Sequence, residues 1–596
     1  MQLAGPSDGE GAAGGLDVRG RAGRHLRRYA PFYVFATVGI VVVSLLPTVD
    51  QSGDGLFAGS GTGGTGRRDR TGLVDGGPLD GGGAAGAGGE AGLTAAERGG
   101  TGGTGSGAAG AAGVLGTQSG TTRAGFDCRP GVRQLPWSKY AAPCVPAFRG
   151  DNGGATWRGV SADKIRVVYR RYNENADTNA IFAVATRGGI APPEVQDQVR
   201  AVMFDYLNRT FELYGRTVEL IEFRTNANPV DEANGQGREQ ACADATRIAE
   251  EFKAFAVLNE ALSYGPFSEC AAERGLVVPI GPYGFPEEWY ERRHPYVFGV
   301  QMNCTRITHQ FVEYIAKRLD ARPARWASDP AYVPQQRRFG VIRPDIEAYF
   351  PCHDLFDDLT RKAGIEIVSE FRYVLEVERL AEQMTRAAIQ FRNDRVSSLL
   401  LSADFLTLIN LTSAAESQRW GPEWIMAGVG LQDLDHFARL YSQPVVDGHM
   451  FGQSQLGAAD FMIGNKGEPA ETYRRATGAE KPQGTEGFYF ALLHTFNLLQ
   501  AAGPHLNPAA IGEGVARLPP AGADGGALGV WSFLTRPDGS PGLSHTAGTD
   551  AREVYWDGSA TSADGNQGTF VATQGGRRFT NGEWSTDEPP VYPNRR

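Results

Sequence analysis

Residues 338–402 read RFGVIRPDIEAYFPCHDLFDDLTRKAGIEIVSEFRYVLEVERLAEQMTRAAIQFRNDRVSSLLLS. The short apolar runs in this stretch are typical of strands that are buried on both faces. The longer segments between them repeat apolar residues at the spacing of amphipathic helices. We therefore predict strands over 338–343, 365–371 and 397–402, and helices over 346–363 and 377–391. Strands that alternate with helices in this way indicate a parallel sheet with helices on both faces.

The same alternation extends in both directions along the chain. Before residue 338, an earlier series predicts strands over 164–169, 217–224, 254–259, 276–280 and 296–300, and helices over 194–214, 236–253 and 305–319. After residue 402, we predict a helix over 405–418, a strand over 424–429, a helix over 485–499 and a helix that begins at Asn507-Pro508. Short terminal strands in a hairpin-like arrangement follow over 553–556, 569–573 and 577–580. Because the alternation restarts once, we predict an α/β fold of two similar Rossmann-like lobes.

An apolar segment near the start of the chain predicts a membrane anchor. Residues 29–47 contain no charged residue, and as a helix they would span about 28 Å, against a hydrocarbon core of about 30 Å. Basic residues lie only on the N-terminal side, so the positive-inside rule retains 1–28 in the cytoplasm and exports the rest. A cleaved signal peptide is the alternative, but no A-x-A-like site follows closely. We expect a single-pass cell-membrane protein with most of the chain on the extracytoplasmic side.

Composition divides the rest of the chain. Residues 48–125 are dominated by Gly, Ala, Ser and Thr, which predicts a disordered, flexible linker. The predicted parts after it are a disulfide-bearing lead-in over 126–163, the first part of lobe 1 over 164–335, lobe 2 over 336–440, a return to lobe 1 over 441–530, and C-terminal strands and a tail over 531–596. The chain has 596 residues and a net charge of -10, and its one dense basic cluster precedes the apolar segment. Nucleic acid is therefore not an expected partner.

All six cysteines lie beyond the apolar segment, at Cys128, Cys144, Cys242, Cys270, Cys304 and Cys352. An even number in an oxidising compartment predicts three disulfides. Fifteen pairings are possible for six cysteines, and sequential pairing closes the shortest loops. No C-x-x-C occurs, which argues against a zinc knuckle and against a thiol-redox motif.

The motifs of common enzymes are missing from the sequence. No G-x-S-x-G occurs, and 452–456 (GQSQL) lacks the second glycine of that motif. There is no P-loop and no H-E-x-x-H, and Cys352-His353 is interpreted as a disulfide cysteine beside a surface histidine. We predict a protein that is not an enzyme and that has no metal site and no cofactor.

Ligands of open parallel sheets bind beyond the carboxyl ends of the strands. The residues that follow the predicted strands are therefore candidate ligand-binding residues: Tyr172, Asn173, Ser263, Tyr264, Gly281, Tyr283, Arg343 and Asp404. Each has a structural alternative. Asp404 can cap the helix that follows it, and Arg343 can pair either with a ligand carboxylate or with Asp345. The tyrosines can offer a flat apolar face with a hydroxyl, or can simply pack between the lobes.

Several short segments carry a family resemblance. They are GDNGG at 150–154 before VSADKIRV at 160–167, VPIGP at 278–282 before YVFG at 296–299, and FGVIR at 339–343. Over about 150–533 the chain resembles the type I periplasmic-binding-fold receptors for branched-chain amino acids that serve ABC transporters, in the divergent membrane-anchored form of high-GC Gram-positive bacteria. The resemblance implies two lobes joined by a hinge of three crossing strands, a small-molecule ligand trapped by hinge closure, and an ABC permease as partner.

The chain departs from this family where the ligand would bind. Family members usually present small and hydroxyl residues after the fourth strand to hold the α-carboxylate and ammonium groups, whereas this chain has GPYGF at 281–285. This difference indicates a larger, flatter or more apolar ligand, or a lobe that no longer binds solutes. A solute receptor is the first hypothesis, a membrane-tethered sensor or scaffold with the same fold is the second, and an extracytoplasmic enzyme is the third.

Overall fold

The computed structural model describes residues 115–593, apart from 261–263, 457–466, 486–487 and 524. Contacts divide the chain into Met1–Thr104 and Gly105–Arg596, so every described residue belongs to the second unit. The predicted anchor at 29–47 and most of the predicted linker at 48–125 lie outside the described residues. Within the described part, no helix is both long enough and apolar enough to span a bilayer.

The first sheet contains three parallel strands in the order β4-β3-β5: β3 at Lys164–Tyr172, β4 at Thr217–Thr225 and β5 at Ala256–Asn259. Single parallel bridges extend it from Ala256 to Val277, from Val278 to Val297 and from Gly299 to Thr546. The strands predicted over 276–280 and 296–300 therefore follow the sheet, but only as isolated bridges. We call this sheet and the helices that cover it lobe 1.

The second sheet has the strand order β12-β11-β10-β9-β8-β6-β7, with β13 paired to β11. Its strands are β6 at Phe339–Pro344, β7 at Ile367–Tyr373, β8 at Ser398–Leu401, β9 at Glu423–Met426, β10 at Met450–Ser454, β11 at Ala551–Thr561, β12 at Gln567–Ala572 and β13 at Arg578–Phe579. Strands β6 to β10 pair in parallel, and β11 pairs antiparallel with its neighbours. We call this sheet and its helices lobe 2.

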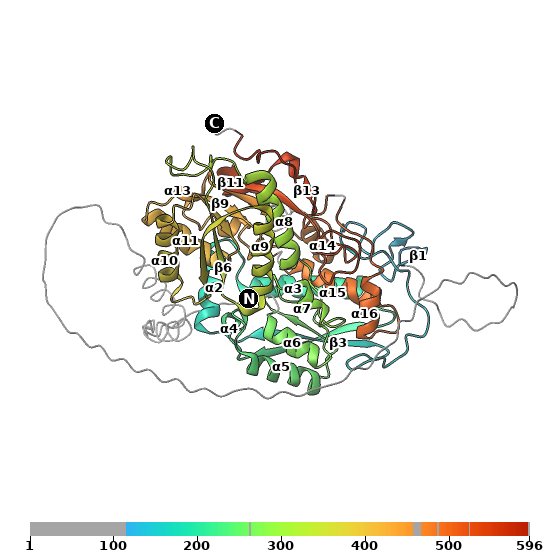
Figure 1. Cartoon of the computed structure of the whole chain (residues 1–596). Helices are drawn as coiled ribbons and strands as arrows, with labels where there is room; N and C mark the ends of the chain where they lie inside the picture. Colours follow the sequence, from blue (N-terminus) through green and yellow to red (C-terminus); the bar gives the residue numbers. More distant parts are fainter. Residues whose placement is uncertain (1–114, 261–263, 457–466, 486–487, 524, 594–596) are drawn as a thin grey trace, which may run out of the picture. The chain divides into compact units, whose positions relative to one another are not determined.

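Helices cover both sheets. In lobe 1 they are α2 at Ala176–Arg187, α3 at Pro193–Thr210, α4 at Pro229–Ala233, α5 at Arg238–Glu250, α6 at Gly265–Glu273, α7 at Glu287–Glu291, α14 at Gly467–Thr477, α15 at Tyr489–Ala502 and α16 at Pro508–Val515. In lobe 2 they are α8 at Cys304–Tyr314, α9 at Phe350–Ala363, α10 at Leu380–Asn393, α11 at Phe405–Ser417, α12 at Asp435–Ala438 and α13 at Gln443–Val446. Figure 1 shows β3, α5 and α6 on one side of the molecule and β6, β9, α10 and α11 on the other.

The structure departs from the predicted division of the chain in three places. Helix α8 falls within the range predicted for lobe 1, but it packs against β6 in the core of lobe 2. Strand β10 falls within the predicted return to lobe 1, and its pairing with β9 places it in lobe 2. The terminal strands form the predicted hairpin, and they also extend the lobe 2 sheet through β11. Strand β10 was missed because its sequence, MFGQS, combines a glycine with two polar residues.

The chain passes between the lobes three times. It leaves lobe 1 after Gly299, returns after β10, and crosses again between Thr546 and the start of β11. Hydrogen bonds join these crossings: Gln455 Oε1 accepts from the Met302 backbone N–H at 2.9 Å, and Gln310 Nε2 donates to the Thr549 carbonyl at 2.9 Å. The result is a two-lobed α/β architecture with parallel strands in both sheets, as the sequence predicts.

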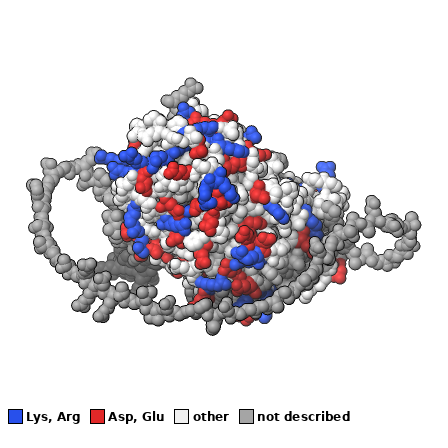
Figure 2. Space-filling model, in the orientation of Figure 1, with Lys and Arg blue, Asp and Glu red and all other residues white. Residues whose placement is uncertain are grey.

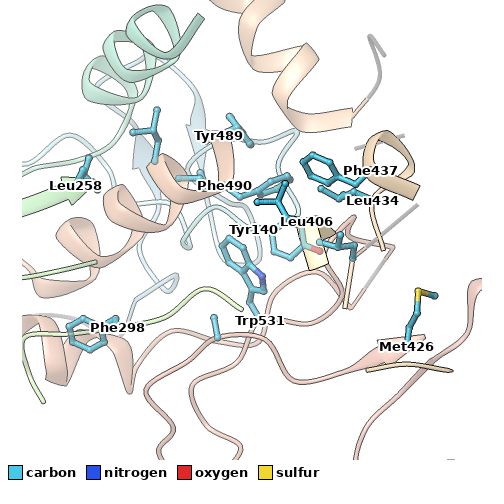
Figure 3. Close-up of a cluster of buried hydrophobic side chains, with 14 of the residues drawn as sticks. Tyr140, Leu258, Phe298, Leu406, Met426, Leu434, Phe437, Tyr489, Phe490 and Trp531 are labelled. Atoms are coloured by element: carbon cyan, nitrogen blue, oxygen red, sulfur yellow. The ribbon is translucent and has the colours of Figure 1, made fainter. Parts of the chain in front are cut away.

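A continuous apolar core lies beneath lobe 1 and extends into lobe 2. Figure 3 shows Tyr140, Phe490 and Trp531 close together in this core. The ring centroids of Tyr140 and Trp531 are 4.6 Å apart, and those of Tyr140 and Phe490 are 5.6 Å apart. Tyr140 belongs to the lead-in at 126–163, so this segment is part of the packed core rather than an extension of the linker.

Three disulfides are present, as predicted, and they follow the sequential pairing, which is one of the fifteen that the sequence leaves open. Cys128 pairs with Cys144 inside the lead-in, Cys242 with Cys270 between α5 and α6, and Cys304 with Cys352 between α8 and α9. On the face displayed in Figure 2, basic and acidic side chains are interspersed.

Candidate ligand-binding site

A cavity of about 260 Å³ lies between the lobes. Lobe 1 contributes the start of α6 and the loop 282–285 to its wall, and lobe 2 contributes the carboxyl ends of β6, β7, β8 and β9. Small-molecule sites in proteins are enclosed, mainly apolar spaces of a few hundred Å³ with a few placed polar groups. The size and position of this cavity fit such a site.

Aromatic side chains form much of the wall: Tyr264, Tyr283, Phe285, Tyr349, Phe356 and Tyr373. Phe285 and Tyr349 come from different lobes and meet edge to face with ring centroids 5.3 Å apart. The Tyr283 hydroxyl donates to the Gly428 carbonyl at 3.1 Å and accepts from Gln455 Nε2 at 3.0 Å. Burial raises the pKa of Tyr264 to about 12, so this phenol is neutral at physiological pH.

Arg343 lines the cavity at the end of β6 and is almost fully buried. It pairs with Asp357 and Glu370 and not with Asp345, so the Asp345 alternative is wrong. Nε donates to Glu370 at 3.0 Å, Nη1 to Asp357 at 3.0 Å and to the His353 carbonyl at 3.4 Å, and Nη2 to both carboxylates at 3.0 and 2.7 Å. A guanidinium has five N–H donors, so these five bonds leave none for a ligand.

His353 also lines the cavity, and its Nδ1 is buried without a hydrogen-bond partner among the described residues. The prediction of a surface histidine is wrong, because only 6% of this residue is exposed. Burial, together with the charges of Arg343 and Arg372, lowers the pKa of His353 to about 3. The imidazole is therefore neutral and provides an unused polar atom at the cavity.

Asp404 follows β8 and serves as the N-cap of α11, as its structural alternative predicted. Oδ1 accepts from the Thr407 backbone N–H at 2.9 Å. Oδ2 accepts from the Thr407 hydroxyl at 2.7 Å and from the Tyr373 hydroxyl at 2.7 Å. An ionised carboxylate accepts about four hydrogen bonds, so one position stays available at the cavity wall.

A buried ion network lies behind the lobe 1 wall. Arg170 donates to Glu232 at 2.7 and 3.0 Å and to Asp244 at 2.7 and 3.0 Å. The Tyr172 hydroxyl donates to Glu232 at 2.7 Å. Tyr172 is thus a member of this network and supports Glu232, which is the member that lines the cavity.

The structure brings four of the predicted residues to the cavity wall: Tyr264, Tyr283, Arg343 and Asp404. Asn173 donates to Asn226 at 2.6 Å and does not line the cavity. Gly281 stands behind the wall, where a Cβ would lie 2.7 Å from Val297 Cγ1, so only glycine fits. Ser263 lies outside the described residues.

Direct contacts hold the two lobes together beside the cavity. Asn234 of lobe 1 donates through Nδ2 to the Leu375 carbonyl at 2.7 Å, and its Oδ1 accepts from the Leu375 N–H at 3.2 Å. The Tyr349 hydroxyl donates to the Tyr283 carbonyl at 3.3 Å. These contacts bridge the cleft, so the structure represents a closed arrangement of the lobes.

Sequence reasoning missed Tyr349, Tyr373, His353 and Asn234. Tyr373 ends the strand β7, so the strand-end rule could have found it if the predicted strand had not stopped at residue 371. Tyr349 and His353 lie on the segment after β6, where an apolar helix pattern gave no sign of a cavity. Among the described residues, no group of three His, Cys, Asp or Glu side chains could hold a metal ion.

No protein-family model matches this chain, and no curated protein matches it. Solved structures do match. One match is LivJ, the substrate-binding protein of a branched-chain amino acid transporter from Streptococcus pneumoniae, in complex with isoleucine. It is 12% identical, and the match covers 69% of this chain and 100% of that chain, with a TM-score of 0.45. A solute-binding protein of an ABC transporter from Rhodopseudomonas palustris, in complex with 3,4-dihydroxybenzoic acid, is 12% identical over 70% of this chain and 98% of that chain, with a TM-score of 0.46.

A third match is a fatty acid ABC transporter substrate-binding protein from Thermomonospora curvata. It is 11% identical, and the match covers 72% of this chain and 97% of that chain with a TM-score of 0.47. These three are structural matches at low sequence identity.

Proposed function

We propose that this protein is an extracytoplasmic solute receptor that captures a small, largely apolar ligand between its lobes for an ABC-type importer. The observation that supports this most directly is the cavity of about 260 Å³, whose wall is shared between the lobes. A ligand that contacts both lobes stabilises the closed arrangement relative to an open one, which is how hinge closure is coupled to binding.

The chemistry of the wall favours binding over catalysis. The tyrosines are neutral, His353 is neutral, and Arg343 is held by two carboxylates. General acid–base catalysis needs a group that exchanges a proton near the working pH, and a nucleophile needs an adjacent base. The described wall offers apolar and aromatic surface with a few fixed polar atoms, and this is what a receptor requires.

The proposed location follows from the disulfides and the N-terminal sequence. The chain has three disulfides, and structural disulfides are typical of oxidising compartments and rare in reducing ones. We assign the anchor to 29–47 and the linker to 48–125, so that the receptor remains attached to the membrane beside its permease.

A ligand screen tests the receptor role. The full chain is melted with and without amino acids, amides, short-chain acids, aromatic acids, sugars and amines, each at a hundredfold excess over a micromolar dissociation constant. A bound ligand stabilises the native state by about 2.7 kcal/mol under these conditions, which raises the melting temperature. A hit without turnover supports a receptor. A folded protein that responds to nothing in the panel, and whose inter-lobe angle is constant in X-ray scattering, would instead indicate a scaffold.

A further inference from the structure

The charges around the cavity are unbalanced. The ionised side chains that line it are Glu232, Arg343 and Asp404. With their ion-pair partners they form a set of five carboxylates, Glu232, Asp244, Asp357, Glu370 and Asp404, and three guanidinium groups, Arg170, Arg343 and Arg372. This set carries two negative charges in excess, so the surroundings of the cavity repel an anion and attract a cation.

No cation in this set has a donor directed at the ligand. All five N–H groups of Arg343 bond to Asp357, Glu370 and the His353 carbonyl. Arg170 stands behind the wall, where it holds Glu232 and Asp244. A ligand carboxylate would therefore lose its hydration in this cavity without gaining a charged partner, which is strongly unfavourable.

Asp404 is the one carboxylate in the set without an ion pair among the described residues. Its partners are the neutral donors Thr407 and Tyr373, and one acceptor position remains. Burial is the largest cause of the raised pKa of Tyr349, and the nearby Tyr264 and the negative charge of Asp404 raise it further. Tyr349 lines the same cavity as Asp404, and the Tyr373 hydroxyl lies 2.7 Å from Asp404 Oδ2.

The aromatic rings next to Asp404 suit the same kind of ligand group. Tyr349, Tyr264, Phe285 and Tyr373 all line the cavity, and the ring faces carry partial negative charge. A desolvated ammonium group is attracted to such faces, and the attraction is largest where water is excluded. His353 is neutral and adds no opposing charge.

We propose that the cavity binds a small organic cation, an alkylammonium or arylalkylammonium without a carboxylate, whose ammonium group donates to Asp404 between the tyrosine rings. This inference rests on the proposed receptor role and specifies its ligand class. The apolar body of the ligand occupies the part of the cavity lined by Ile307, Phe311 and Val341.

Two matched sets of probes test the ligand class by calorimetry on the full chain. One set is 2-phenylethylammonium, 3-phenylpropanamide and 3-phenylpropanoate, and the other is isoamylammonium, 4-methylpentanamide and 4-methylpentanoate. Within each set the body is similar and only the head group changes its charge. We expect the ammonium compound of at least one set to bind about tenfold or more tightly than its amide and its carboxylate.

The Asp404→Asn variant tests the contact itself. Asparagine is as good an N-cap as aspartate, so the cap of α11 is retained while the charge is removed. We expect the affinity for the cation to fall about 10- to 100-fold and the affinity for the neutral amide to change little. Asp358→Asn is the matched control, because Asp358 lies partly exposed on α9, away from the cavity wall, and pairs with Arg361 and Lys362. If Asp404→Asn does not fold, Tyr349→Leu is expected to weaken cation binding while Tyr349→Phe retains it.

The outcomes separate this inference from the receptor role. If a carboxylate or a neutral solute from either set or from the wider panel binds and the cations do not, the ligand class is wrong and the receptor role stands. If a cation binds equally well to wild type and to Asp404→Asn, the assignment of its ammonium group to Asp404 is wrong. If the folded protein binds nothing in the panel or in either set, the receptor role fails, and the ligand class fails with it.

Discussion

Asn234 provides a direct way to test whether closure of the cleft controls ligand affinity. Its side chain makes two hydrogen bonds to the backbone of Leu375 on the other lobe, at 2.7 and 3.2 Å. These bonds exist only when the lobes are closed. The Asn234→Ala substitution removes both and leaves the cavity wall intact, since Asn234 does not line it.

The magnitude follows from the two bonds. Each neutral hydrogen bond contributes about 1 kcal/mol net, so the closed arrangement loses about 2 kcal/mol relative to the open one. If the free protein is mostly open, this loss appears in full as a decrease of about 30-fold in ligand affinity. If the free protein is already mostly closed, the decrease is smaller and the radius of gyration of the free variant increases instead.

Asn208 is a matched control within a single lobe. Its Nδ2 donates to the Val218 carbonyl at 2.9 Å, and its Oδ1 accepts from the Val218 N–H at 2.8 Å. Asn208→Ala therefore removes the same pair of bonds without affecting closure. We would measure affinity by calorimetry and closure by X-ray scattering for both variants, using the best ligand from the screen. An Asn234→Ala protein with wild-type affinity and wild-type scattering would refute the coupling, as would an equal loss of affinity in Asn208→Ala.

Three further predictions concern stability and the cavity wall. Burial raises the pKa of Glu468 to about 7, so the stability that its protonated form contributes is fully present below about pH 4 and is lost as the pH rises through 7. In thermal melts, the stability of wild type relative to Glu468→Gln should therefore fall by about 3 kcal/mol between pH 4 and pH 8. Replacing Cys304 and Cys352 with serine opens a loop of 48 residues and should lower the free energy of unfolding by about 4 kcal/mol. It should also weaken ligand binding in calorimetry, because both cysteines line the cavity. Replacing Cys128 and Cys144 with serine should lower the free energy of unfolding by about 3 kcal/mol and leave the ligand affinity unchanged. Arg343→Met should lower the free energy of unfolding by about 1–3 kcal/mol but should not weaken ligand binding more than a few fold in calorimetry. A larger loss of affinity, confined to carboxylate ligands, would show that Arg343 binds the ligand.

The sequence predicted the fold well because strands and helices leave different periods in the chain. The runs at 164–169, 217–224 and 338–343 are apolar enough to identify strands without tertiary information, and β3, β4 and β6 begin within one residue of the predicted positions. The number of disulfides could be predicted from the six cysteines, but their pairing could not; the structure has the sequential pairing, which closes the shortest loops. Helix α8 was assigned to the wrong lobe because a helix pattern shows which face is buried but not which sheet buries it.

Only about half of the candidate site could be predicted from the sequence, for a physical reason that Arg343 and Asp404 illustrate. Both follow buried strands, so topology places both at the cavity, and by sequence alone the arginine is the better candidate for holding a ligand. The structure reverses this order, because Glu370 on β7, Asp357 on α9 and the His353 carbonyl together occupy every donor of Arg343. Asp404 has only neutral partners and retains one acceptor position. Whether a charged group is available to a ligand depends on what its neighbours in space have already satisfied, and those neighbours lie 14 and 27 residues from Arg343 along the chain. The charge that the cavity wall presents is thus set by pairings that no local sequence pattern contains.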